Sequence, residues 1–90
     1  MLVKYIRDGQ KLIGCVVATG PSQIGVSILN PKDTFSKERA KTIAVGRSLT
    51  GSICHVPKRK VDVCGFDFSL DAVVSGEVLV MQERSLRYFK

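Results

Sequence analysis

The sequence predicts an α+β fold in which an antiparallel β-sheet meander of about four to five strands packs with two helices. Two observations carry this prediction. Short β-branched runs separated by turn residues fill the first thirty residues, and two later segments repeat apolar residues with the spacing of an α-helix. Because 90 residues leave room for one core, we expect a single small domain over residues 1–90.

The first three strands are predicted from their turns. Residues 2–6 and 12–17 flank the dipeptide Asp8-Gly9, which readily takes the positive φ of a tight hairpin turn. A third β-branched run, residues 24–29, ends at Asn30-Pro31. These three strands are expected to form one antiparallel meander.

A first helix is predicted over about residues 35–49, after the turn chemistry of residues 30–33. Thr34 or Ser36 could cap it, since either hydroxyl accepts a hydrogen bond from a free N–H group. Its inward stripe is expected to hold four residues at i, i+3, i+4 and i+7: Ala40, Ile43, Ala44 and Arg47.

The second half of the chain is predicted to add two short strands and a helix. Residues 52–56 and 61–66 resemble strands, separated by the basic run 57–60. A helix over residues 70–88 is expected, with Ser69 as N-cap and an inward stripe of Leu70, Val74, Val78, Met81, Ser85 and Tyr88. A hairpin about Ser75-Gly76 is the competing interpretation, because β-branched runs lie on both sides of that dipeptide.

The charge of the chain points to an anionic partner. Fourteen Lys and Arg against eight Asp and Glu give a formal charge of +6, which raises the local concentration of anions. The simpler explanation is that this charge keeps a small protein in solution. We see no signal peptide or membrane span, so a cytoplasmic protein without membrane contact is expected, with its three cysteines (Cys15, Cys54 and Cys64) reduced.

Candidate ligand residues are cations and aromatic side chains on the two helices. A guanidinium on an inward stripe, as expected for Arg47, pairs within the chain, reaches out to water, or recognises a phosphate or carboxylate. Arg84 and Arg87 precede Tyr88 and Phe89 in the last helical turns, a combination that suits phosphate binding with base stacking. Complementing the helix dipole and packing on the core explain the same residues without a ligand.

Two loops offer further candidates. Asn30, Asp33 and Phe35 stand before the first helix, whose N-terminal N–H groups could receive an anion, although helix capping explains them as well. The basic residues 58–60 could contact a nucleic-acid backbone in a salt-dependent way, or they could simply be solvated.

No metal, cofactor or catalytic site is predicted. Cys54 and His55 are neighbours on an expected strand, so their side chains point to opposite faces and are poorly placed to share one zinc ion. The same argument separates them as a thiol and base pair. We therefore expect a binding protein and not an enzyme.

Three segments resemble small proteins encoded by bacteriophages and prophages: residues 24–37 (IGVSILNPKDTFSK), 41–47 (KTIAVGR) and 83–89 (ERSLRYF). Among these proteins, the chain resembles the first family of Thoeris anti-defence proteins. The resemblance implies a homo-oligomer in the cytoplasm of the host cell. It further implies that the protein sequesters a small cyclic nucleotide immune signal, such as an isomer of cyclic ADP-ribose, between subunits and without turnover.

If so, Arg47, Arg84 and Arg87 would contact phosphate, and Phe35 or Tyr88 would stack on the base. Two alternative functions stay open: a small basic regulator that binds nucleic acid through residues 58–60, and an inhibitor that docks on an acidic surface of a host protein. A small core also favours a homo-oligomer on physical grounds.

Overall fold

The computed structural model describes residues 1–29, 36–51 and 56–89. Its elements are β1 (Leu2–Asp8), β2 (Lys11–Gly20), β3 (Gln23–Ile28), α1 (Lys37–Thr50), β4 (Lys60–Val63), β5 (Phe66–Ser69) and α2 (Leu70–Tyr88). The predicted α+β class with an antiparallel sheet is confirmed. The sheet has three strands instead of four to five, because β4 and β5 form a separate two-stranded sheet.

The first sheet is the expected meander, with β2 between β1 and β3. Its first turn contains Gly9, whose φ of 60° suits a tight hairpin. The register between β1 and β2 shifts once: Ile6 lies opposite Gly14, and the next residue, Arg7, lies opposite Leu12. Ile13 is therefore the extra residue of a β-bulge. The bulge reverses the alternation of side chains between the two faces of the sheet, so Ile13 lies in the same apolar cluster as Val16.

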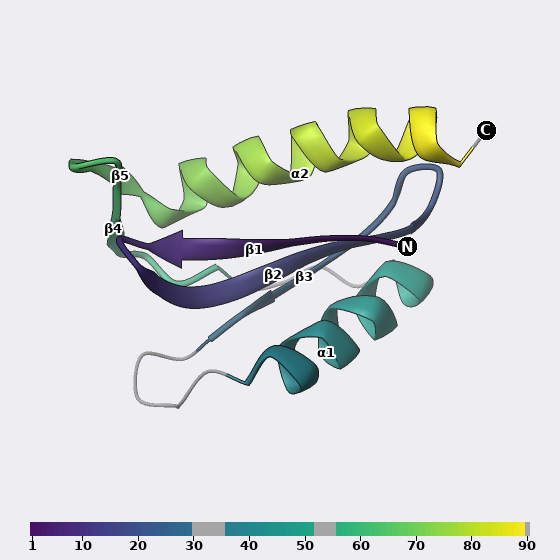
Figure 1. Cartoon of the computed structure of the whole chain (residues 1–90), viewed down its shortest axis with the longest axis horizontal. Helices are drawn as coiled ribbons and strands as arrows, with labels where there is room; N and C mark the ends of the chain where they lie inside the picture. Colours follow the sequence, from purple (N-terminus) through teal and green to yellow (C-terminus); the bar gives the residue numbers. More distant parts are fainter. Residues whose placement is uncertain (30–35, 52–55, 90) are drawn as a thin grey trace.

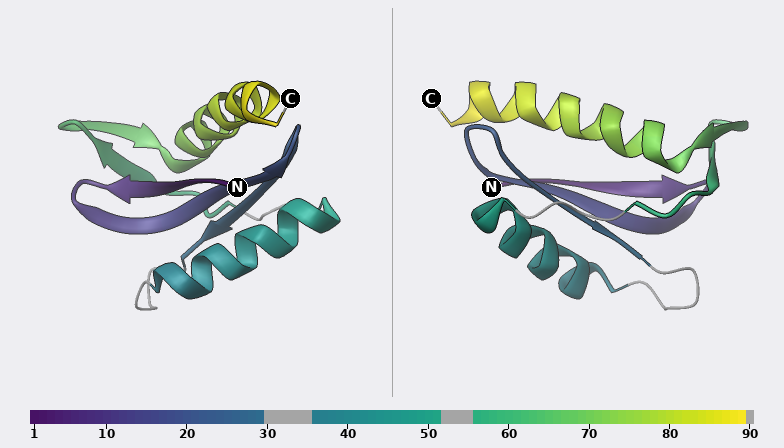
Figure 2. Two further views of the ribbon diagram at one scale, coloured as in Figure 1. Left: turned by 45° about the vertical axis from the view of Figure 1, so that its right-hand side comes forward. Right: turned by 180° about the vertical axis from the view of Figure 1, so that it is seen from behind.

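The two helices cover opposite faces of this sheet, as Figures 1 and 2 show. On the α2 side, the larger apolar cluster includes Val16, Leu70 and Met81. On the α1 side, Cys15 and Val17 of β2 pack against Ala40 and Ala44. The sheet is therefore the middle layer of three.

Helix α1 begins where Ser36 caps it, as expected, because its Oγ accepts a hydrogen bond from the Arg39 N–H at 3.3 Å. The predicted stripe is partly wrong, since Ile43 is 38% exposed. The buried residues of α1 are Ala40, Ala44 and Ser48. This small-residue face lets the helix backbone approach the sheet closely at Gly25.

The single strand predicted at residues 61–66 is instead a hairpin of β4 and β5. Cys64 and Gly65 both adopt positive φ, 53° and 85°, and turn the chain back where the sequence favoured a continuing strand. Lys60 then pairs with Ser69. Residues 52–55 of the first predicted strand lie outside the described residues, and Val56 is not in a strand.

The predicted C-terminal helix is confirmed with the same bounds, 70–88, and the alternative hairpin about Ser75-Gly76 is wrong. Of its predicted stripe, Val78 is half-buried and Tyr88 exposed, while the other four residues are buried. Ser85 Oγ accepts a hydrogen bond from Ser22 N–H at 3.1 Å, which joins the end of α2 to the β2–β3 turn.

We expect Gly25→Ala to destabilise the fold strongly. A Cβ at this position would lie 1.9 Å from the carbonyl oxygen of Ala44, so α1 would have to move away from β3. Overpacking of this kind costs about 3 kcal/mol or more of unfolding free energy, measurable by urea denaturation. Gly46→Ala is the matched control: its Cβ would meet nothing within 4 Å, and it should stabilise α1 by up to about 1 kcal/mol. An unchanged midpoint for Gly25→Ala would contradict the close packing of α1.

Candidate functional site

A basic segment is held at the start of α2 by the backbone. The N–H of Gly9 donates to the carbonyl oxygen of Asp62 at 2.9 Å, and the N–H of Asp62 donates to Oδ1 of Asp8 at 2.9 Å. These bonds fix β4 against the β1–β2 turn. The N–H of Leu70, the first residue of α2, donates to the carbonyl oxygen of Arg59 at 2.9 Å. Residues 58–60 are thereby placed beside the N-terminus of α2.

A pocket of about 560 Å³ lies at this junction, near the end of the molecule where β4 and β5 are drawn in Figure 1. Its volume falls in the range of small-molecule sites. It is lined by Val56, Lys58, Arg59, Lys60, Ser69 and Asp71. Three basic residues and one acidic residue are therefore among those that line a space large enough for a small ligand.

Arg59 is the most unusual member of this pocket. Its Nε and Nη2 atoms are buried and have no hydrogen-bond partner among the described residues. Burying a charged donor without a partner costs free energy, so buried guanidinium groups are normally paired. The planar fork of Arg59 therefore lacks a carboxylate or phosphate partner among the described residues.

The N-terminus of α2 adds to the positive potential here. Ser69 occupies the predicted N-cap position, but its side chain makes no capping hydrogen bond. The first N–H groups of a helix lack intrahelical partners and carry the positive end of the helix dipole. Asp71, in the first turn, offsets part of this charge and supplies a hydrogen-bond acceptor to the pocket.

Arg47 is largely engaged within the chain. Its Nη1 donates a hydrogen bond to the carbonyl oxygen of Val26 in β3 at 2.7 Å. The side chain is half-buried at the border of the α1 face that packs on the sheet. This partner is a backbone carbonyl and not an Asp or Glu side chain, and ligand recognition by Arg47 stays a prediction.

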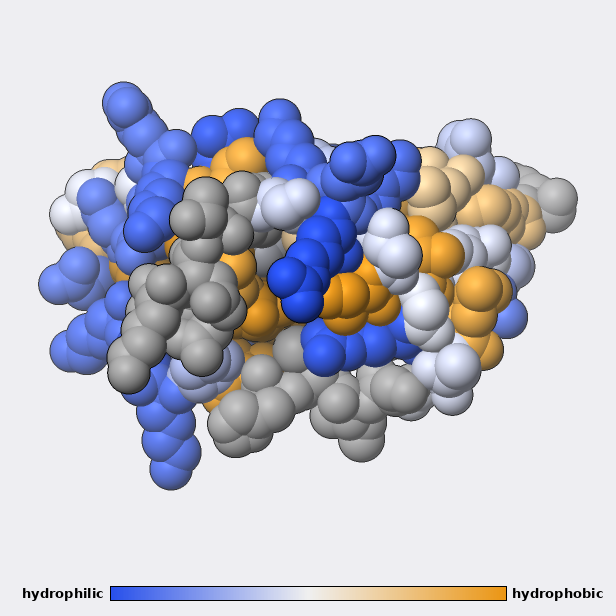
Figure 3. Space-filling model, turned by 90° about the horizontal axis from the view of Figure 1, so that it is seen from below, coloured by the Kyte–Doolittle hydropathy of each residue, from blue (hydrophilic) through white to orange (hydrophobic). Residues whose placement is uncertain are grey.

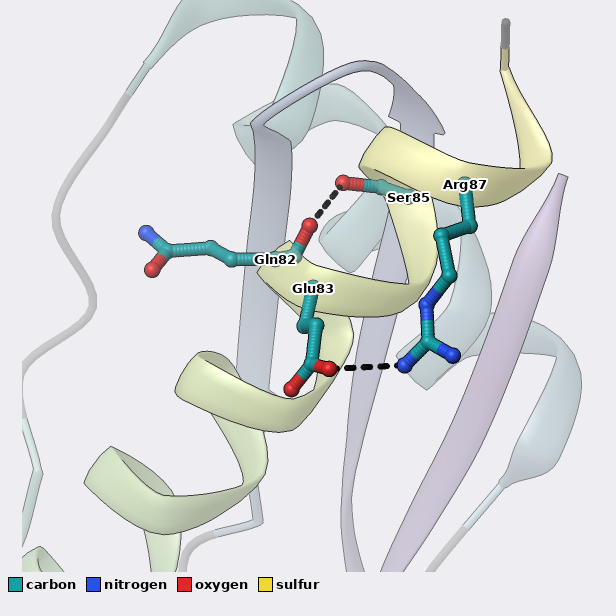
Figure 4. A network of polar contacts seen from close by, with 4 residues as sticks. All are labelled: Gln82, Glu83, Ser85 and Arg87. Atoms are coloured by element: carbon teal, nitrogen blue, oxygen red, sulfur yellow. Dashed lines mark hydrogen bonds and ion pairs between the residues drawn. The ribbon is translucent and has the colours of Figure 1, made fainter.

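The arginines at the end of α2 lie in a different layer from Arg47, because the sheet separates the two helices. Nη2 of Arg87 pairs with Oε1 of Glu83 at 2.7 Å, and both side chains are mostly exposed. Figure 4 shows the Arg87 side chain turned back along the helix toward Glu83. Arg84 and Tyr88 are exposed, and the Tyr88 ring meets Phe89 edge to face with centroids 4.9 Å apart.

The remaining predicted ligand residues (Asn30, Asp33 and Phe35) lie outside the described residues, as do Cys54 and His55. Within the described ranges, no group of three metal-binding side chains comes together. Burial raises the pKa of the Cys15 thiol to about 11, while nearby Lys41 acts in the opposite direction. Cys15 is therefore a protonated core residue at neutral pH.

From the sequence, residues 58–60 were predicted only as a possible contact for nucleic acid. Their position in a pocket could not be derived from the sequence, because it depends on the Cys64-Gly65 turn that brings Ser69 opposite Lys60. The available signal was a basic run followed about ten residues later by the start of a helix.

Comparisons with known protein families, curated proteins and solved structures find no match. Among the helices that the structure describes, none combines the length and the apolar character that crossing a membrane requires.

We expect Arg59→Met to stabilise the ligand-free protein. Methionine keeps a flexible apolar stem and removes two buried donors that have no partner in the described part of the chain. The free energy of unfolding should therefore rise by about 1–2 kcal/mol in urea titrations. Arg84→Met, at an exposed position on α2, is the control and should change stability by less than about 0.5 kcal/mol. A loss of stability in Arg59→Met would show that the guanidinium is satisfied in the free protein.

Proposed function

We propose that this protein binds a small phosphate-bearing ligand without transforming it, in the pocket beside Arg59. The proposal rests on Nε and Nη2 of Arg59, which are buried and have no hydrogen-bond partner within residues 1–29, 36–51 and 56–89. A phosphate accepts two parallel hydrogen bonds from such a fork, and these charge-assisted bonds are stronger than those between neutral groups.

The surroundings of Arg59 support a nucleotide more than a bare phosphate. Lys58 and Lys60 add positive charge, and the N-terminus of α2 favours an anion. Asp71 and Ser69 can accept hydrogen bonds from hydroxyl or amino groups, and Val56 offers apolar surface. A sugar phosphate with an attached base combines all of these groups.

The finer proposal is that the ligand is a cyclic nucleotide immune signal, and that the protein is a bacteriophage anti-defence protein that sequesters it in the host cytoplasm. This step rests on the resemblance of residues 24–37, 41–47 and 83–89. In that proposal Asn30, Asp33 and Phe35 remain candidate ligand residues, with Arg47, Arg84, Arg87 and Tyr88. The pocket adds Arg59 as the principal phosphate contact.

Isothermal titration with a panel of cyclic and linear nucleotides tests this function. Saturable binding is expected, and Arg59→Ala should weaken it about ten-fold or more, since a hydrogen bond to a charged group contributes roughly 1.5–3 kcal/mol. Arg59→Lys should restore only part of the affinity because it retains the charge without the fork.

Arg84→Ala and Arg87→Ala separate the two possible sites. Affinity unchanged in both would place the ligand in the pocket. If these variants abolish binding and Arg59→Ala does not, the ligand lies at the end of α2 and the assignment to the pocket is wrong. Binding of a single-stranded oligonucleotide alone, with steep salt dependence, would favour the nucleic-acid regulator instead.

A further inference from the structure

The pocket beside Arg59 is lined by residues of both charges. Lys58, Arg59 and Lys60 are its basic lining residues, and Asp71 is an acidic one. Neither of the ion pairs between described residues includes Asp71. Its carboxylate is therefore separated from the basic groups with which it shares the pocket.

The backbone fixes Asp71 relative to Arg59. The N–H of Leu70 donates to the carbonyl oxygen of Arg59 at 2.9 Å, and Asp71 is the next residue of α2. Ser69, on the other side of Leu70, lies opposite Lys60 in the β4–β5 hairpin. The acidic residue is thus held beside the basic segment by main-chain contacts and not by an ion pair with it.

The basic residues of α1 are arranged differently. Lys37, Arg39 and Lys41 are exposed in its first turns. Figure 3, which views the molecule from below, on the α1 side, shows long hydrophilic side chains projecting from that face. Exposed cations of this kind attract anions through a screened field but do not orient them. The mixed charges of the pocket can orient a ligand, because each kind of group requires a different part of it.

A nucleoside 5′-phosphate carries groups that match both kinds of lining residue. Its phosphate accepts hydrogen bonds from the planar fork of Arg59. On the other side of its ribose, two neighbouring hydroxyls can donate to the two oxygens of one carboxylate. An ionised carboxylate only accepts hydrogen bonds, so Asp71 favours these donors and repels any further anionic group.

We propose that Asp71 determines the specificity of this pocket: its carboxylate accepts hydrogen bonds from both hydroxyls of the ligand's ribose and repels a second phosphate at that position. The inference rests on the proposed function and narrows the ligand to a nucleotide with a free vicinal diol. Among cyclic nucleotides, the pocket then favours those whose ribose keeps both hydroxyls over 3′,5′-cyclic phosphates, whose 3′ oxygen is esterified.

An acidic residue in the first turn of a helix also stabilises that helix through its dipole. This contribution of Asp71 is the same whether or not the ligand carries a diol. A comparison of two ligands on one variant therefore separates contact with the sugar from any effect on the stability of α2.

Isothermal titration with two ligands tests the diol contact: AMP, and 2′,3′-dideoxyadenosine 5′-monophosphate, which lacks both hydroxyls. The wild-type protein should bind AMP about ten-fold more tightly, since hydrogen bonds to a charged acceptor are among the stronger ones. In Asp71→Asn this preference should fall to about three-fold or less, because the charged acceptor is lost. The affinity for the dideoxy ligand should not fall, since that ligand makes no bond with the carboxylate.

Adenosine 3′,5′-bisphosphate tests the repulsion, because a phosphate takes the place of one hydroxyl. Asp71→Asn should raise the affinity for this ligand relative to AMP about five-fold or more. Asp67→Asn is the matched control: it removes the same charge from an exposed position of β5, outside the residues that line the pocket. Both preferences should stay as in the wild-type protein.

Three results would overturn the inference: wild-type protein that binds AMP and the dideoxy ligand equally, Asp71→Asn protein that keeps the wild-type preferences, or changes in preference that Asp67→Asn reproduces. The first needs no variant, so it decides the matter even where a substitution impairs folding. Absence of AMP binding would overturn the inference as well. The proposed function fails only when no nucleotide of the wider panel binds or when Arg59→Ala leaves the affinity unchanged.

Discussion

The structure depends on covering strand β2 on both faces. Four consecutive residues of this strand are completely buried: Cys15, Val16, Val17 and Ala18. Both faces of the strand are therefore shielded from water. A central strand of this kind needs a packed layer above and below it. Helices α1 and α2 supply these layers, and the close approach at Gly25 shows how tightly one of them is held.

This arrangement also determines where chemistry can occur. Because the helices occupy opposite faces, Arg47 of α1 is separated by the sheet from the arginines of α2, and it bonds to the backbone of β3 instead. The β4–β5 hairpin is tied to the β1–β2 turn through Asp62, and α2 starts directly after it. Arg59 is consequently held beside a helix N-terminus in a pocket of its own chain.

Local patterns predicted most of the fold and little of the site. Turn chemistry and periodicity are local, so they identified the first hairpin at Gly9 and the full extent of α2. The hairpin at Cys64-Gly65 was missed, because a cysteine with positive φ gives no recognisable signal. Ile43 was wrongly predicted to lie on the inward stripe of α1. The inward face depends on the close approach of α1 to Gly25 of β3, which the helix sequence alone does not show. Nε and Nη2 of Arg59 have no partner among the residues that the structure describes, and this is a tertiary property that no spacing of residues reveals.

The most direct test of the account is a ¹H–¹⁵N NMR titration of the uniformly labelled protein with adenosine diphosphate. The largest chemical-shift changes are expected at the amides of Arg59, Lys60 and Asp71, where the fork and the helix N-terminus would meet the phosphates. Shifts concentrated between residues 84 and 89, or no shifts at saturating nucleotide, would contradict it.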